Sequence, residues 1–157
     1  MNLLVRLLPV LTCATGIIAP SASFAAVTHC NILFADSAAT IPGQQTTSFQ
    51  TFVNLAGAAI TFTSSLDCLI VHFTAQVRAK LPEKVRIRAI LDGTEVAFPS
   101  VVEWSTPTNE DDGHSATFIF PNVSADTHTV RIQFLSVDGG TVAISRGLLT
   151  IRYKGQA

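Results

Sequence analysis

One short stretch of the chain concentrates oxygen ligands of the kind that bind hard cations. Asn109, Glu110, Asp111 and Asp112 follow one another in a polar stretch, and Asp126 could add a further carboxylate. Such oxygens suit calcium, but the spacing lacks the alternating acids and the distal glutamate of an EF-hand loop. A calcium site is therefore weighed against a plain solvated acidic loop. We favour the loop and expect no cofactor.

The four histidines form no pattern that predicts a metal site or catalysis. His29, His72, His114 and His128 are scattered, with no HxH or HExxH spacing. We place His72 and His128 on the more polar faces of their expected strands, as surface or partner-contact residues. The chain has no G-x-S-x-G sequence, and its paired carboxylates lie only in the acidic loop, where nothing apolar would raise a pKa. We expect no catalytic residues and no enzyme.

Two further residues could bind or carry a sugar. Trp104 is the single tryptophan, and on the rim of a sandwich it could stack against a sugar ring. It is our weak candidate for ligand binding, weighed against a half-buried core residue, which we favour. Asn122 begins the sequon Asn-Val-Ser, which matters only in a host that glycosylates.

Charge is segregated along the chain. A basic stretch that contains Glu83 as its one acid holds Arg78, Lys80, Lys84, Arg86 and Arg88. Residues 89–130 then hold seven acids and no Lys or Arg: Asp92, Glu95, Glu103, Glu110, Asp111, Asp112 and Asp126. The basic set is our candidate partner surface, but we favour solvated faces whose opposite charges meet on neighbouring strands. The net charge is −1 and no consecutive run of Lys or Arg occurs, which argues against a nucleic-acid partner.

Strands must position these residues, because the hydrophobic period is two almost everywhere. Asp92-Gly93 and Asp138-Gly139-Gly140 are turn signals between alternating runs. We expect strands at about 28–35, 47–53, 58–64, 67–79, 84–92, 95–105, 115–121, 127–137 and 141–153, with 36–46 as a loop. This pattern predicts an all-β fold: a two-sheet antiparallel β-sandwich, jelly-roll-like, with an immunoglobulin-like sandwich as the alternative.

The first 25 residues have the pattern of a secretory signal peptide. Arg6 precedes an apolar segment, and Ser23 and Ala25 are the small residues that a signal peptidase accepts, so we place cleavage after Ala25. The apolar run is short for the alternative, a membrane anchor. We expect a single domain over 26–157, secreted or periplasmic, with no stable membrane insertion. In that compartment Cys30 and Cys68 should form a disulfide; two buried thiols are the alternative.

Several strand-and-turn motifs resemble those of a known group of proteins. They are VRIRAILDGT at 85–94 with Pro99, HTVRIQF at 128–134, VDGGTV at 137–142 and LLTIRY at 148–153. Together they resemble uncharacterised secreted bacterial β-sandwich proteins, whose shape is similar to the C1q/TNF-like jelly roll. The resemblance covers roughly residues 65–154 and implies a jelly roll and a homotrimer. It implies no catalytic residue.

A second resemblance is to chaperone–usher pilins. It rests on the signal peptide, on cysteines 38 positions apart and on Tyr153 near the end of the chain. Only four residues separate the expected cleavage site from Cys30, and they span about 14 Å at most, too little for a donor strand. We therefore expect an exported binding or adhesion module that acts through a β-sandwich surface on an extracellular protein or glycan. The alternatives are a structural subunit of an extracellular assembly, and a carbohydrate-binding accessory domain or small exported enzyme.

Overall fold

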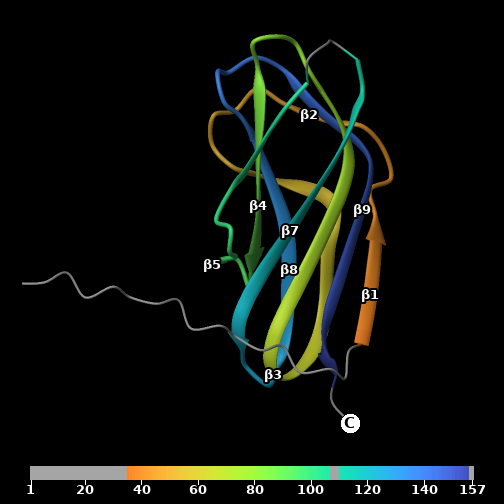
Figure 1. Cartoon of the computed structure of the whole chain (residues 1–157), viewed down its shortest axis with the longest axis vertical. Coiled ribbons are helices and arrows are strands. Elements are labelled where there is room, and N and C mark those ends of the chain that lie inside the picture. Colours follow the sequence, from red (N-terminus) through yellow and green to blue (C-terminus); the bar gives the residue numbers. More distant parts are fainter. Residues whose placement is uncertain (1–34, 107–109, 156–157) are drawn as a thin grey trace, which may run out of the picture.

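Antiparallel strands form two packed sheets, and one long strand takes part in both (Figure 1). The computed structural model describes residues 35–106 and 110–155. Its strands are β1 (Ala35–Thr40), β2 (Gln45–Thr47), β3 (Val53–Ala79), β4 (Lys84–Leu91), β5 (Glu95–Val96), β6 (Val102–Ser105), β7 (Asp112–Val123), β8 (Thr127–Ser136) and β9 (Val142–Gly155). The all-β antiparallel sandwich expected from the alternating pattern is confirmed.

Strand β3 crosses from one sheet to the other near residue 64. Its first part, residues 53–63, pairs with β8, which also pairs with β4; β5 and β6 lie beside β4. We call this the β8 sheet. The second part, from residue 64 to 79, lies between β9 and β7, with β1 and β2 on the far side of β9. We call this the β9 sheet. Phe98 and Ile119 exchange two backbone hydrogen bonds of 2.8 and 2.7 Å, which join the two sheets along one side.

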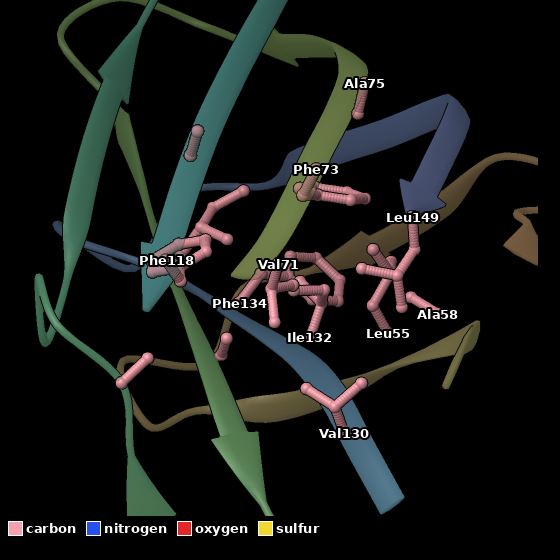
Figure 2. Close-up of a cluster of buried hydrophobic side chains, with 14 of the residues drawn as sticks. Leu55, Ala58, Val71, Phe73, Ala75, Phe118, Val130, Ile132, Phe134 and Leu149 are labelled. Carbon is pink, nitrogen blue, oxygen red and sulfur yellow. The ribbon is translucent and has the colours of Figure 1, made fainter. Parts of the chain in front are cut away.

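Alternation of apolar and polar residues builds the core between the sheets. In β3, Val71 and Phe73 are fully buried, whereas His72 between them is exposed. Figure 2 shows these two side chains in one buried cluster with Ile132 and Phe134 of β8, which are at most 2% exposed. One face of each sheet is therefore apolar and the other is available to solvent, as antiparallel sandwiches require.

Four of the expected boundaries are wrong. The expected strand 47–53 is mostly a connection, because β2 ends at Thr47 and β3 begins at Val53. Residues 36–46, expected as a loop, contain β1 and β2. Ala, Ser and Asp have low strand propensity, so their strand depends on pairing with β9, which sequence periodicity does not report. The expected strands 58–64 and 67–79 are one continuous β3, and the expected strand 95–105 is two short strands, β5 and β6.

A glycine allows the chain beyond β1 to pack tightly on β9. Ile41 donates its backbone N–H to the Gly147 carbonyl at 2.9 Å, and the Ile41 side chain fills the space that a Cβ on Gly147 would occupy. The Gly147→Ala variant should therefore be less stable by about 1–2 kcal/mol, because a packed isoleucine must move. Urea unfolding of the variant tests this. Gly43→Ala, whose Cβ would meet nothing within 4 Å, is the control and should unfold like the parent.

A buried carboxylate joins two turns at one end of the sandwich. Glu83, in the β3–β4 turn, is 4% exposed. It accepts hydrogen bonds from the Ser136 hydroxyl at 2.7 Å, the Asp138 amide at 2.9 Å and the Gly140 amide at 2.7 Å. Burial alone would raise the pKa of Glu83, but these hydrogen bonds together hold its pKa below the usual value.

Several sequence predictions fall outside the described residues. The signal peptide, the cleavage site, His29 and Cys30 lie before residue 35, so export and the Cys30–Cys68 disulfide stay predictions. Cys68 itself lies in β3 and is 1% exposed. Within residues 35–106 and 110–155, no helix has the length and apolar character needed to cross a membrane.

Candidate functional site

A hollow of about 500 Å³ lies on the outer face of the β9 sheet. The strand register arranges its lining in two rows that cross four strands. In one row Ala38, Thr150, His72 and Thr117 lie side by side on β1, β9, β3 and β7. In the next row Asp36, Arg152 and Ile70 occupy the same three strands, followed by Ile119 on β7. The complete lining is Asp36, Ser37, Ala38, Ile70, His72, Thr117, Thr150, Ile151 and Arg152.

The hollow offers both hydrogen-bonding groups and an apolar floor. His72 Nδ1 lies 3.1 Å from the Thr117 hydroxyl, while Nε2 makes no hydrogen bond to any residue of the described chain. The Thr150 hydroxyl donates to the His72 carbonyl at 3.4 Å, a weak bond that a ligand could replace. Arg152 Nε donates to Asp36 Oδ1 at 3.1 Å, so the two charges of the lining balance each other. A ligand here meets hydroxyls, one imidazole and no excess charge.

Most of the expected partner surface is paired with acids or with neutral groups of the chain itself. Lys84 and Arg86 share Glu103 at 2.7 and 2.9 Å, and Arg78 binds Asp111 at 3.0 Å. Hydrogen bonds from Lys84 and then Arg86 lower the pKa of Glu103, and the bond to Glu103 raises the pKa of Lys84. The favoured interpretation, opposite charges meeting on neighbouring strands, is thus confirmed for these three cations.

The remaining two cations of the expected partner surface, Lys80 and Arg88, lie in different surroundings. Lys80 lies with Arg78 beside a smaller hollow next to β9. Arg88 has no carboxylate partner in the described chain; its Nε donates to Gln133 at 2.8 Å. The five cations therefore lie on different parts of the surface rather than forming one patch.

The residues proposed for calcium do not form one site. Asp112 begins β7, whereas Asp126 follows its other end, about 36 Å away for a twelve-residue strand. Asp126 instead accepts a hydrogen bond from the Thr127 amide at 2.7 Å. Asp111 is held by Arg78. Asn109 lies outside the described residues, and the described ones contain no cluster of three metal-ligating side chains.

Trp104 cannot serve as an open sugar platform. Its side chain is 5% exposed, with its ring stacked on Phe73 at 5.9 Å and on His114 at 5.2 Å. The indole is therefore buried against two rings of the protein. The ligand-binding candidate is corrected, and the alternative of a core residue is the one that the packing supports.

His128 lies on the inward face of its strand, so the expectation that it lies on the polar face is wrong. It shares the inward face of β8 with Val130 and Ile132 and is 7% exposed. Its Nδ1 lies 2.7 Å from Asp92 Oδ2, and its Nε2 lies 3.0 Å from the Ser124 carbonyl and 3.3 Å from the Ser124 hydroxyl. His72, in contrast, is exposed as expected.

Asp92, His128 and Ser124 are connected in the same sequence as the carboxylate, imidazole and hydroxyl of a catalytic triad. The imidazole contacts, however, require a proton on both nitrogens, which a triad base does not carry. A carboxylate and a carbonyl only accept, so the two short contacts require a proton on each imidazole nitrogen. Burial alone would lower the pKa of His128, but the bonds to Asp92 and then Ser124 leave it raised. Burial would likewise raise the pKa of Asp92, yet His128 and the Thr129 amide lower it. In this doubly protonated form the imidazole cannot take the proton of Ser124, and its contacts link the β4–β5 turn to the β7–β8 turn.

Comparisons with known proteins provide no family and no named relative. No family model and no curated protein matches this chain. A solved structure described as "EclA C-terminal domain; sugar-binding protein" is similar over 83% of this chain and 86% of that one, with 9% identity and a TM-score of 0.36. A likeness at this level carries no argument about a ligand, so the function rests on the geometry above.

Proposed function

We propose that this chain is an exported, non-enzymatic binding module that holds a neutral, hydroxyl-rich ligand, such as a saccharide unit, in the hollow of the β9 sheet. The observation that supports it most strongly is the row of Thr150, His72 and Thr117 across three adjacent strands. Hydroxyls and an imidazole both donate and accept, which matches the mixed hydrogen bonding of a sugar. Ile70 and Ala38 provide apolar surface for the face of a sugar ring that presents its C–H groups.

Charge supports a neutral ligand at this site. The Asp36 and Arg152 side chains satisfy each other, so a charged ligand would have to break their contact or add an unbalanced charge. The imidazole of His72 has no carboxylate within the lining to act with it, because Asp36 is held two strands away. The hollow therefore suits binding better than acid–base chemistry.

The proposal includes the localisation and the oligomeric state of this module. The signal-peptide pattern of residues 1–25 supports a secreted or periplasmic protein. The motif resemblance supports a homotrimer, and a structural subunit of an extracellular assembly is the alternative. Light scattering coupled to size-exclusion chromatography separates these arrangements, because a trimer gives one closed species and an assembly subunit gives open polymers.

Binding to a glycan array, followed by calorimetry on any hit, tests the hollow directly. The His72→Ala and Thr150→Val variants should each bind the hit about fivefold to tenfold more weakly, because each removes about one hydrogen bond. Thr94→Val, which alters an exposed threonine of the β4–β5 turn, is the matched control and should bind like the parent. A parent protein that binds no glycan, or hollow variants that bind as well as the parent, would contradict the proposal.

A further inference from the structure

The outward side of the β8 sheet has an excess of positive charge. The outward positions of β4, β6 and β8 carry Lys84, Arg86, Arg88 and Arg131 against the carboxylate of Glu103. Glu103 is already shared by Lys84 and Arg86. The remaining two arginines, Arg88 and Arg131, make no ion pair with any residue of the described chain.

These two arginines are neighbours across two strands. Arg88 faces Gln133 and Arg131 faces Ile90 in the β4–β8 register, so the arginines lie on a diagonal, about 7–8 Å apart. Two like charges at that distance repel each other, and nothing in the described part of the face neutralises them. Ile90 between them is nevertheless 4% exposed, as expected if arginine stems cover it.

Arg88 is held in place before any ligand arrives. Its guanidinium lies 4.0 Å from the centre of the Phe52 ring, and its Nε donates to Gln133 Oε1 at 2.8 Å. Gln133 in turn donates to Asn54 Oδ1 at 2.9 Å. These contacts use the ring-facing side and the Nε of Arg88, which leaves its two Nη groups as donors. A pre-oriented guanidinium loses less entropy when it binds an oxyanion.

We propose that this face, defined by Arg88, Arg131 and Gln133, is a second binding surface and that it takes an acidic polysaccharide with carboxylate or sulfate groups. Paired Nη donors match both kinds of oxyanion. The hydroxyl pairs Thr61–Thr129 at 2.9 Å and Thr63–Thr127 at 3.2 Å extend the polar surface along the same sheet. This surface lies on the opposite side of the sandwich from the hollow and goes beyond the function proposed for it.

A nucleic acid fits the same face less well. Single strands bind largely by stacking bases on aromatic rings, and the Phe52 ring near these arginines is already covered by Arg88. A nucleic-acid ligand is therefore an outcome of the test rather than the proposal.

Fluorescence anisotropy of the labelled full chain tests the surface with four probes: dextran sulfate, polygalacturonate, neutral dextran and the oligonucleotide (dT)20. The parent should bind one or both acidic polymers, more weakly as salt rises. Any binding of neutral dextran should not depend on salt, because it would belong to the hollow. Binding to dextran sulfate alone indicates sulfate recognition, and binding to polygalacturonate alone indicates carboxylate recognition. Tighter binding to (dT)20 than to both acidic polymers would overturn the proposal, as would no binding to either.

Two matched double variants separate this surface from general charge attraction. Arg88→Gln with Arg131→Gln should weaken polymer binding by about tenfold or more, because both oxyanion contacts are lost. Arg146→Gln with Lys154→Gln removes the same charge from β9 and should stay within about twofold of the parent. An equal loss in both double variants would overturn the proposal. His72→Ala should leave polymer binding unchanged, so failure of the hollow and failure of this surface are distinguishable.

Discussion

The Glu83→Ala variant should be less stable than the parent by about 3–5 kcal/mol at neutral pH. The carboxylate of Glu83 accepts hydrogen bonds from two backbone amides and one hydroxyl at the β8–β9 end of the sandwich. Alanine removes every acceptor, so the buried Ser136 hydroxyl and the part-buried amides of Asp138 and Gly140 lose a charged partner. Chemical denaturation at pH 7 measures the loss. Glu95→Ala, an exposed carboxylate on β5, is the control and should change little.

The stability that Glu83 contributes should depend on pH. The pKa of Glu83 is lowered by folding, so its contribution is present above the unfolded carboxyl pKa and is lost as pH falls through the folded value. The stability gap between the parent and Glu83→Gln should therefore be constant near neutrality and narrow below about pH 4.5. Denaturation at pH 7 and pH 3 measures both ends. A gap that widens in acid would show that Glu83 is held as the neutral acid.

Alternation predicts the fold class well because burial on one face of a strand is a local property. Val71, Phe73 and their neighbours show which residues point inward without any knowledge of partners. The edge strand β1 is different, since Ala35–Thr40 has no apolar alternation and depends on β9 for its hydrogen bonds. The continuity of β3 through residue 64 also depends on its partners, which change from β8 to β9 along its length.

The hollow could not be predicted because it is a property of register. Ala38, His72, Thr117 and Thr150 are far apart in the sequence, and only the pairing of four strands brings them into one row. The opposite arginine surface depends on register in the same way. His128, however, carried a usable signal: it has the parity of Val130 and Ile132, and a histidine at an inward position suggests a buried partner.

Replacing His128 with phenylalanine should lower the free energy of unfolding by about 2–3 kcal/mol at pH 5.5, with the largest effect in mildly acidic solution. The ring packs near Phe62, with 5.9 Å between ring centres, so phenylalanine keeps most of the apolar contact. It loses the bonds to Asp92 and to the Ser124 carbonyl, which tie the β4–β5 turn to the β7–β8 turn. Half of the Asp92 side chain is exposed, so solvent screens part of the loss.

The pH dependence of this loss follows from two opposite shifts. The pKa of His128 is raised by folding, so its contribution is complete below about pH 6.5 and disappears as pH rises through the folded value. The pKa of Asp92 is lowered, so its contribution is present above about pH 4 and disappears as pH falls through the folded value. The gap between parent and His128→Phe should therefore be widest between about pH 4 and 6.5 and should narrow by pH 9.

The Asp92→Asn variant separates the charge from the turn geometry. Asp92 has a φ of 49°, a conformation that asparagine tolerates, and an asparagine oxygen can still accept from the Thr129 amide. The Asp92→Asn variant should therefore keep the turn. The fall of its free energy of unfolding at alkaline pH should be smaller than in the parent, because nothing then raises the pKa of His128 as strongly. A gap for His128→Phe that grows from pH 5.5 to pH 9 would contradict the cross-link. It would mean that a neutral imidazole contacts Ser124, and the case against a catalytic role for these three residues would fail with it.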